Sequence, residues 1–481
     1  MNKYHPYYET IYRTIMGNYK LKGKDLKQIN YKSDRAKSLA IDIMQQNFKH
    51  LSKPEKLKLL EDVLLNPKEF ISHNAFSKLA EEFIGRTRIE GGTVYNLDVV
   101  EKSFKMYGGQ LITPETIEQM KVAMQLPISV SGALMPDAHV GYGLPIGGVL
   151  ATENSVMPYG IGLDIGCRMS LSIYDVPAEF IKRNGYQIKT SLKENTHFGI
   201  GKVFKQTEDH EVLDRSEFHE TALLKQLHGK AKMQLGSSGS GNHFVEVGIV
   251  ELGPNNRLKI PEGNYLGILA HSGSRGLGAA IASHYTQIAM KKCHLPKKAK
   301  HLAWLDLGSE AGQEYWLSMN LAGDYAKACH DVIHYKLAKS MGVKAIAKIE
   351  NHHNFAWKEI HDGKELIVHR KGATPANKGQ LGIIPANMID PGYIVTGNGA
   401  ADSLFSASHG AGRKMSRKKA KESITGSELK KKLKQTGVTT IGGTVDEAPM
   451  TYKNIEEVMR SQKDLVNIEG KFYPQIVRMD K

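Results

Sequence analysis

The sequence has few cysteines and no long hydrophobic segment. Only three cysteines, Cys167, Cys293 and Cys329, occur in 481 residues. Three thiols cannot form a disulfide framework, so we expect free thiols in a reducing compartment. No apolar run approaches the roughly 20 residues of a membrane-spanning helix, and the first residues lack the apolar core of a secretory signal. We therefore expect a cytoplasmic protein without a membrane partner.

Two common motifs of nucleotide-using enzymes are also absent. The sequence contains no Gly-x4-Gly-Lys-Ser/Thr loop, which excludes a P-loop nucleotide engine. It also contains no Lys-x-Asp-Gly motif, which carries the acceptor lysine of the usual ligases and capping enzymes. If this chain activates a phosphate with a nucleotide, a group other than that lysine must be the nucleophile.

Positive charge exceeds negative charge, with a net charge of +15. Such an excess favours an anionic partner, most commonly nucleic acid, although a basic surface can also serve solubility alone. The basic residues cluster at residues 291–300 and 413–434. Because clustering is more typical of a binding face than of general solubility, the charge pattern favours a nucleic-acid partner.

The composition changes near residue 95, where glycine becomes frequent. Before this point the chain is rich in Lys, Leu and Glu, and residues 52–65 predict a helix with Ser52 as its cap and Pro54 in its first turn. Residues 1–95 are therefore predicted to be a helical appendage for packing or partner binding. Residues 96–481 are predicted to form one α+β catalytic domain, with residues 315–341 as a helix that buries Cys329.

A glycine-rich stretch at residues 158–168 organises the second region. It places Asp164 and Cys167 three residues apart on a loop. The following residues 169–176 alternate apolar and polar side chains, which predicts a half-buried strand. Upstream, Asp137 and His139 would share one face of an extended segment, as a paired acid and imidazole or as a structural hydrogen bond.

Histidines occur at four separate glycine-flanked junctions. His243 follows a glycine-serine loop, with Asn242 and Glu246 beside it, and His271 ends a strand just before Arg275. Adjacent side chains diverge in an extended chain, so only one of His352 and His353 is expected to face a site. His409 precedes Gly410, Ala411, Gly412 and Arg413.

These residue types suit metal-assisted phosphate chemistry. A thiolate with imidazoles and a carboxylate suits Zn²⁺ or a borderline ion such as Mn²⁺ or Co²⁺, and a thiolate can bridge two ions. Ligands scattered over nearly 200 residues indicate a catalytic site rather than a zinc finger. A neutral imidazole at His409 could attack a phosphorus atom, with Arg413 offsetting the phosphate charge.

Seven motifs in one order resemble the RtcB RNA-splicing ligases from about residue 95 to the end. They are PDAHVGYG, GIGLDIGC, GNHFVE, HSGSRGLG, HHN, SHGAGR and DEAPMTYK. The resemblance implies a buried dinuclear metal site, two Mn²⁺ ions per chain and GTP. It implies joining of RNA 2',3'-cyclic phosphate or 3'-phosphate ends to 5'-hydroxyl ends, in tRNA splicing or RNA repair. The reaction would pass through a guanylated histidine and then an RNA 3'-phosphate capped with GMP.

The resemblance also assigns residues. Asp164, Cys167, His243, His271 and His353 would be the metal ligands, with Cys167 as the bridge, and His409 the guanylated nucleophile. Phosphates would face Arg275 and Arg413. The nucleotide would contact Asn242, Glu246, Asn354, Pro385, Asn387, Met388, His409, Gly410, Ala411, Gly412, Tyr452 and Lys481. Residues 385–392 depart from the family's usual Gly-Ser-Met-Gly-Thr type loop.

The sequence thus predicts a GTP- and Mn²⁺-dependent RNA ligase. We expect a monomer, with an archease-type activator as a candidate partner. A metal-dependent phosphoesterase or nuclease would use the same ligands and the same positive face to activate water, and is the alternative. A non-enzymatic RNA-binding protein is the third interpretation, disfavoured by the complete set of ligand-type residues.

Overall fold

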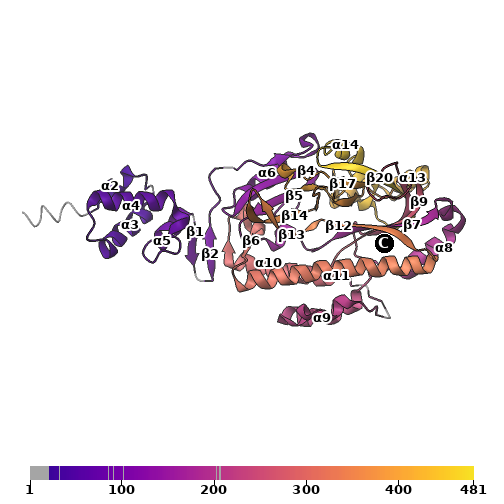
Figure 1. Ribbon diagram of the computed structural model, residues 1–481, viewed down its shortest axis with the longest axis horizontal. Helices are drawn as coiled ribbons and strands as arrows, with labels where there is room; N and C mark the ends of the chain where they lie inside the picture. Colours follow the sequence, from indigo (N-terminus) through magenta and orange to yellow (C-terminus); the bar gives the residue numbers. More distant parts are fainter. Residues whose placement is uncertain are drawn as a thin grey trace, which may run out of the picture. The chain divides into compact units, whose positions relative to one another are not determined.

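The computed structural model describes residues 21–481 except residues 32, 85, 90, 101, 202, 205 and 206. Residues 1–20, whose sequence carries the expectation about a secretory signal, lie outside the described part. The chain divides into two compact units, Met1–Asp98 and Val99–Lys481 (Figure 1). Each unit has a hydrophobic core of its own, and the candidate ligands all belong to the second unit.

The described part of the N-terminal unit consists of helices followed by a hairpin. Its elements are α2 (Gly23–Gln28), α3 (Asp34–Asn47), α4 (Lys53–Leu65), η1 (Pro67–Phe70), α5 (Ser77–Phe83), β1 (Arg86–Ile89) and β2 (Gly92–Tyr95). The predicted helix is confirmed as α4, where Ser52 and Glu55 form a capping box and Pro54 lies in the first turn. Leu26, Tyr31 and Leu60 are fully or almost fully buried in the core of this unit.

A large sheet forms the centre of the second unit, and its order is β12-β7-β9-β8-β20-β17-β16, with β19 paired to β20. Neighbouring strands along this order are antiparallel. The strands are β7 (Arg168–Pro177), β8 (Phe244–Leu252), β9 (Gly263–Ser272), β12 (Ala345–His352), β16 (Leu381–Ile384), β17 (Gly392–Gly397), β19 (Thr439–Ile441) and β20 (Val466–Met479).

A second sheet has the order β13-β14-β5-β4-β3. Its strands are β3 (Lys105–Met106), β4 (Ser129–His139), β5 (Ile146–Thr152), β13 (Asn354–His361) and β14 (Lys364–Lys371). Short pairs join β15 (Ala373–Pro375) to β18 (Ser406–Ser408), and β11 (Leu305–Asp306) to β6 (Ser155–Val156). Because β13 follows β12 after one residue, the two sheets meet at His353. The predicted α+β class is confirmed.

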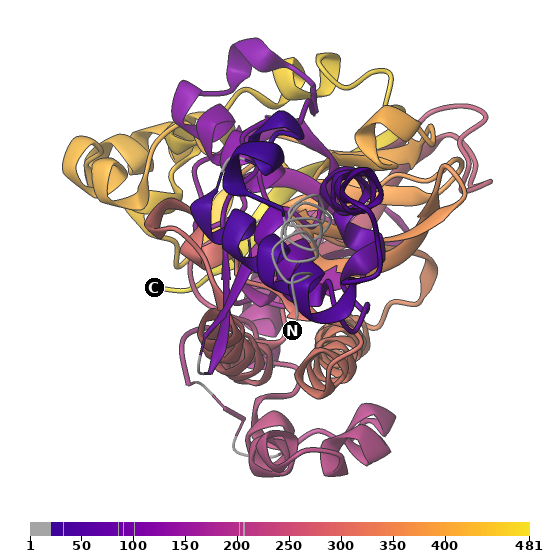
Figure 2. The same ribbon diagram turned by 90° about the vertical axis from the view of Figure 1, so that its left-hand side faces the viewer.

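Two long helices, α10 (Arg275–Lys292) and α11 (Glu310–Met341), run along the large sheet (Figures 1 and 2). Ile333 and Leu337 of α11 share a buried cluster with Ile188 of α8 (Glu179–Asn195) and with side chains of β8 and β9. Cys329 is fully buried in α11, which confirms its interpretation as a core residue. The remaining helices are α6 (Pro114–Met124), α7 (Pro158–Ile161), α9 (Ala222–Gln234), α12 (Arg417–Ser423), α13 (Gly426–Thr436) and α14 (Ile455–Arg460).

Strand β7 corrects one expectation from the sequence. Alternation predicted a half-buried strand, but residues 168–174 are all buried. The apolar side chains Leu171 and Ile173 pack into the core of the sheet, while the polar Ser172 faces α11 and hydrogen-bonds His334 at 2.8 Å. The alternation is genuine, but a helix rather than water covers the polar face. Within the described residues, no helix combines the length and apolar character that crossing a membrane requires.

Candidate active site

Four strand ends meet at one end of the large sheet and bring the metal-ligand candidates together. His352, the last residue of β12, pairs with Arg168, the first residue of β7. Arg168 in turn pairs with Ser272 at the end of β9, and His271 pairs with Phe244 at the start of β8. Because adjacent strands are antiparallel, the ends of β12 and β9 and the starts of β7 and β8 coincide. The side chains flanking these ends therefore converge.

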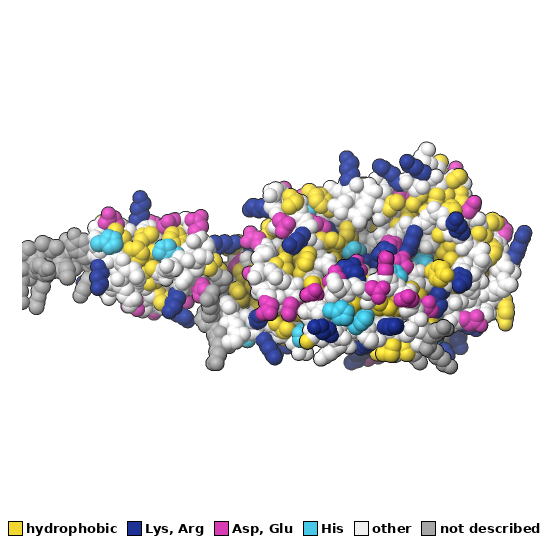
Figure 3. All heavy atoms as spheres, turned by 60° about the horizontal axis from the view of Figure 1, so that its bottom comes forward, with side chains coloured by type: hydrophobic (Ala, Val, Ile, Leu, Met, Phe, Trp, Pro, Cys, Tyr) yellow, Lys and Arg dark blue, Asp and Glu magenta, His cyan; other side chains and the backbone are white. Residues whose placement is uncertain are grey.

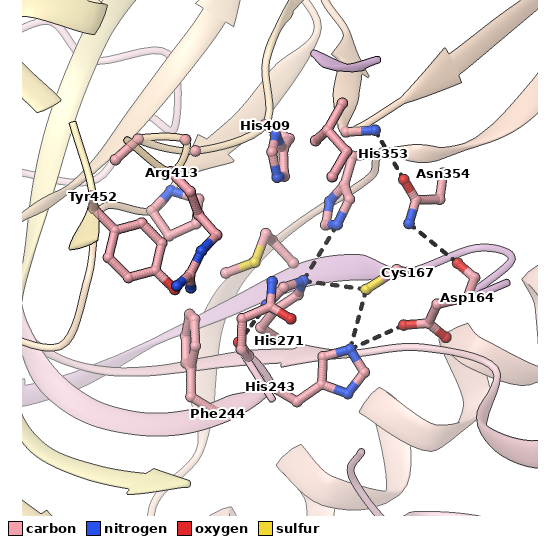
Figure 4. Close-up of a pocket in the computed structure, with 18 of the residues that line it drawn as sticks. Asp164, Cys167, His243, Phe244, His271, His353, Asn354, His409, Arg413 and Tyr452 are labelled. Carbon is pink, nitrogen blue, oxygen red and sulfur yellow. Dashed lines mark hydrogen bonds and ion pairs between the residues drawn. The ribbon is translucent and has the colours of Figure 1, made fainter. Parts of the chain in front are cut away.

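The converging side chains form a tight cluster around Cys167 (Figure 4). Its Sγ lies 3.4 Å from Nε2 of His243 and 3.2 Å from Nε2 of His271. Nε2 of His271 lies 3.3 Å from Nε2 of His353, and Nε2 of His243 lies 2.9 Å from Oδ2 of Asp164. The five residues that the resemblance assigned as ligands thus lie in one continuous chain of contacts.

The cluster divides into two possible ion sites that share one sulfur. Cys167, His271 and His353 form one group of donors, and Asp164, Cys167 and His243 form the other. In each group the ligand atoms lie within 4.8 Å of one another. Sulfur, imidazole nitrogen and carboxylate oxygen together suit a borderline divalent ion, and a thiolate common to both groups can bridge two. The donor set therefore fits a dinuclear centre.

Burial controls the protonation of these donors. Burial and the neighbouring His243 lower the pKa of His271 to about 3, and burial lowers the pKa of His353 well below its usual value. Burial, together with the charge of Asp164, raises the pKa of the Cys167 thiol. Burial would also raise the pKa of Asp164, but its hydrogen bond with His243 outweighs this and leaves the pKa at about 2. Before an ion binds, His271 and His353 are neutral and the Cys167 thiol keeps its proton.

Local backbone features fix the two loop ligands. The backbone N–H of Gly166 donates to the carbonyl of Asn354, and that of His353 donates to the carbonyl of Cys167. Gly273 faces the Asp164 carboxylate closely, because a Cβ added there would lie 2.0 Å from Oδ1. These contacts tie the Asp164–Cys167 loop to the β12–β13 junction. Backbone hydrogen bonds therefore fix the positions of Asp164, Cys167 and His353 relative to one another.

His409 lies beside the cluster and is held by a buried carboxylate that the sequence did not pair with it. Its ring is 4.9 Å from that of His353, centroid to centroid. Its Nδ1 lies 2.7 Å from Oδ2 of Asp137, which also accepts the backbone N–H of His409 at 3.2 Å. His139 instead contacts the backbone carbonyl of Asp137 at 3.0 Å through its Nδ1. The Asp137–His139 spacing was a valid signal for an acid at the site, but it indicated the wrong imidazole.

One cavity contains most of the predicted site. It is lined by all five ligand candidates and by His409, Asn242, Glu246, Asn354, Pro385, Asn387, Met388, Gly410, Ala411, Gly412, Arg413 and Tyr452. Asn354 donates from Nδ2 to the carbonyl of Asp164 at 3.3 Å and accepts the N–H of Gly372 at 2.9 Å. Burial raises the pKa of the Glu246 carboxyl well above its usual value. The cavity thus joins the metal-ligand cluster to a wall rich in polar groups.

Three predicted residues are placed differently. Lys481 is exposed and does not belong to the described cavity lining. Arg275 donates to Ser237 at 3.0 Å and to the carbonyl of Gly199 at 2.9 Å, also away from that lining. Arg413 reaches the cavity, but it lies 3.3 Å from Glu447 and 5.3 Å over the Tyr452 ring. Its guanidinium is therefore already matched to a buried carboxylate.

The sequence did not single out Lys371 and Glu447 as cavity residues. Lys371 ends β14, and its Nζ donates to the carbonyls of Tyr142 and Tyr159. Burial lowers its pKa to about 7. Glu447 accepts from the hydroxyl of Tyr452 and pairs with Arg413. The Arg370-Lys371 pair at a strand end was a usable signal for Lys371. Glu447 lies in the DEAPMTYK motif, but only the fold places it opposite Arg413.

The chain is similar in sequence to one protein family and to several known proteins. Residues 119–480 match the family described as tRNA-splicing ligase RtcB. RNA-splicing ligase RtcB1 of Escherichia coli is 32% identical over 367 residues, which cover 70% of this chain and 86% of that protein. tRNA-splicing ligase RtcB of Nanoarchaeum equitans is 33% identical over 433 residues, 75% of this chain and 90% of that protein. The Thermococcus kodakarensis protein of that name is 29% identical over 466 residues.

Fold and site together define an α+β protein in which one cavity contains a histidine held by a carboxylate and a cluster of side chains, centred on Cys167, that could hold metal ions. The chain belongs to the RtcB family. All seven sequence motifs fall in the second unit, Val99–Lys481.

Proposed function

We propose that this protein is a GTP- and Mn²⁺-dependent RNA ligase. Its substrates are RNA ends with a 2',3'-cyclic phosphate or 3'-phosphate and RNA ends with a 5'-hydroxyl. The observation that carries the proposal is the position of His409. Its Nδ1 is held at 2.7 Å by Asp137 while its ring lies 4.9 Å from His353, a member of the metal-ligand cluster. A nucleophile and a metal centre therefore face one cavity.

The ring orientation suits attack on phosphorus. With Nδ1–H donated to Asp137, the second ring nitrogen, Nε2, keeps its lone pair. His409 Nε2 attacks the α-phosphorus of GTP, the bond to the β-phosphate oxygen breaks, and pyrophosphate leaves. A 2',3'-cyclic phosphate must first be opened by water, with cleavage of the bond between phosphorus and O2', to give the 3'-phosphate. The RNA 3'-phosphate then displaces His409 from the GMP phosphorus. Finally, the 5'-hydroxyl attacks the RNA phosphorus and GMP leaves.

The metal-ligand residues serve the same steps. Asp164, Cys167, His243, His271 and His353 would hold two Mn²⁺ ions, which supply Lewis-acid stabilisation of phosphate charge when bound. Glu246, Asn242 and Asn354 on the cavity wall are proposed to orient the nucleotide. Lys371, whose pKa of about 7 rises next to an anion, can add positive charge at that wall. A monomeric state, a cytoplasmic location and an archease-type activator remain predictions.

Joining assays test the proposal against the phosphoesterase alternative. Purified protein with Mn²⁺ and GTP is incubated with one RNA that ends in a 3'-phosphate or 2',3'-cyclic phosphate and another that begins with a 5'-hydroxyl. We expect a joined product that requires GTP, and no joining of 3'-hydroxyl to 5'-phosphate ends. Release of inorganic phosphate or RNA cleavage without joining, independent of GTP, would support the hydrolase instead.

A further inference from the structure

A basic segment leads from the cavity onto the surface of the second unit. Residues 413–436 contain ten basic and two acidic side chains. They comprise the turn after Gly412, then α12 and α13. Arg413 and Arg417 line the cavity, whereas the lysines beyond them are exposed. The segment therefore carries a strong excess of positive charge from the cavity wall outward.

The arginines and the lysines of this segment have different partners. Arg417 lies 3.1 Å from Asp446 and also pairs with Glu447, and Arg413 lies 3.3 Å from Glu447. Both carboxylates are buried. The contacts of the lysines are weaker, since Lys418 and Lys421 each lie 3.9 Å from a carboxylate. The arginines fix the wall of the cavity, and the lysines are left to face solvent.

Six lysines of the segment have no ion-pair partner among the described residues. No described carboxylate lies within 4.0 Å of the ammonium groups of Lys414, Lys419, Lys430, Lys431, Lys432 or Lys434. All six are exposed. Four of them fall within residues 430–434, where like charges on one short helix repel one another and destabilise it. A purely solubilising surface gains nothing from such crowding, whereas a polyanion that binds there offsets it.

Helix α13 is attached so that these lysines must point outward. Leu429 and Leu433, four residues apart, pack with Met388 and Met479 in a small apolar cluster. Met388 and Met479 also line the cavity. The helix is thus fixed to the cavity wall by one face, while the lysines occupy the remaining surface. Its 11 residues extend over roughly 16 Å, enough to follow several phosphates of an extended strand.

Two other parts of the second unit have mixed charge. On the face turned toward the viewer in Figure 3, lysine and arginine side chains alternate with aspartate and glutamate side chains. The second basic cluster, residues 291–300, borders a groove in which Lys298 faces Glu115 and Glu118. The acidic side chains at these surfaces repel phosphates and so weaken the attraction of the basic ones. The α12–α13 surface is therefore the more suitable path for a polyanion that enters the cavity.

We propose that the lysines of α12, of α13 and of the turn before α12, called the basic ridge, bind the phosphodiester backbone of the RNA whose end reacts in the cavity. The ridge consists of Lys414, Lys418, Lys419, Lys421, Lys430, Lys431, Lys432 and Lys434. This inference rests on the proposed ligase function and adds a contact remote from the reacting phosphate. Phosphate contacts of this kind set affinity and position without reading sequence. The ridge therefore favours long RNA over short RNA.

The test replaces four ridge lysines and compares them with a matched set. The ridge variant carries Lys430→Gln, Lys431→Gln, Lys432→Gln and Lys434→Gln. The control variant carries Lys291→Gln, Lys292→Gln, Lys297→Gln and Lys300→Gln, which are also exposed. Affinity for a fluorescent 3'-phosphate RNA of about 20 nucleotides is measured by anisotropy across salt concentrations. His409 guanylylation and joining of RNAs of about 4 nucleotides are measured in parallel.

We expect the ridge variant to lose at least about tenfold in affinity for the long RNA. The slope of log K against log salt should become less steep, by about 3 in magnitude. Guanylylation and joining of the short RNAs should stay at the wild-type level, and the control variant should bind long RNA within about twofold of wild type. Unchanged affinity in the ridge variant, or an equal loss in the control, would overturn the proposal. If the wild-type protein is neither guanylylated nor joins RNA, the proposed ligase function is wrong. The binding data still show whether the basic ridge binds RNA.

Discussion

Asp137 and His409 are 272 positions apart in the chain, yet Oδ2 of Asp137 lies 2.7 Å from Nδ1 of His409. Asp137 has no exposed surface, and His409 keeps only 15% of its side chain exposed. Burial would raise the pKa of Asp137, but the charge and hydrogen bond of His409 outweigh this and lower it. The carboxylate therefore stays ionised and fixes both the tautomer and the orientation of the imidazole.

Asp137→Asn tests this relationship. The amide keeps the size of the side chain but cannot hold Nδ1–H in the same way, so His409 would turn or change tautomer. We expect the rate of His409 guanylylation to fall by about 10² to 10⁴. Single-turnover labelling with GTP at saturating Mn²⁺ gives the rate. Metal content should remain at the wild-type value, because Asp137 does not contact the ligand cluster. A guanylylation rate within about threefold of wild type would remove Asp137 from this role.

The division of the cluster into two donor groups predicts metal stoichiometry. Cys167 belongs to both groups, whereas His353 belongs to one and His243 to the other. We expect Cys167→Ala to lose both ions, and His353→Ala and His243→Ala to lose one each. Mass-spectrometric metal analysis of protein dialysed against Mn²⁺ gives the count. Loss of both ions in His243→Ala together with retention of one in Cys167→Ala would contradict a shared thiolate.

The protonation of Cys167 predicts how metal affinity depends on pH. Burial raises the pKa of this thiol, so an ion must displace its proton, whereas His271, with a pKa of about 3, is already neutral. Affinity for Mn²⁺ should therefore rise with pH, by about tenfold per pH unit between roughly pH 5 and 8. Titration calorimetry in buffers of different ionisation enthalpy counts the proton released. A pH-independent affinity across this window would show that the thiol is not a ligand.

Gly412 holds the turn after His409 against Asp137. Its φ is +74°, and a Cβ added there would lie 2.1 Å from the backbone oxygen of Asp137. Gly412→Ala should therefore lower both stability and guanylylation, by about 2 kcal/mol or more in the free energy of unfolding. Gly379→Ala is the matched control, because its φ is +77° but no atom lies within 4 Å. It should cost only about 1 kcal/mol and leave guanylylation unchanged. Equal losses in both variants would argue against the contact with Asp137.

Much of the site could be predicted because short-range signals mark it. Cys167, His243, His271 and His353 each lie at a strand end flanked by glycine or a polar turn, and these positions are visible in the sequence. Antiparallel order in the large sheet then brings these ends together. Helix α4 was predictable for the same local reason, since its cap and its proline act within one turn.

Long-range partners could not be predicted from such signals. Asp137 meets His409 only because β4 and β18 lie close in the fold, and local spacing suggested His139 instead. Arg413 lines the cavity where phosphates were expected, but its partner Glu447 could not be predicted because only the fold brings the two together. The burial of β7 depends on α11, which begins well over 100 residues later in the chain. Each of these outcomes depends on which segments pack together, and neither residue type nor periodicity specifies that.

The most direct test of the account is transfer of label from α-labelled GTP to His409 in the presence of Mn²⁺. After denaturing separation, the protein-bound label is challenged with acid and with alkali, because a phosphoramidate on histidine is acid-labile and alkali-stable. The account predicts such a label in the wild-type protein, and none in His409→Ala, whose metal content should be unchanged. Absence of label from the wild-type protein with its metal bound, or a label that persists in His409→Ala, would contradict the account.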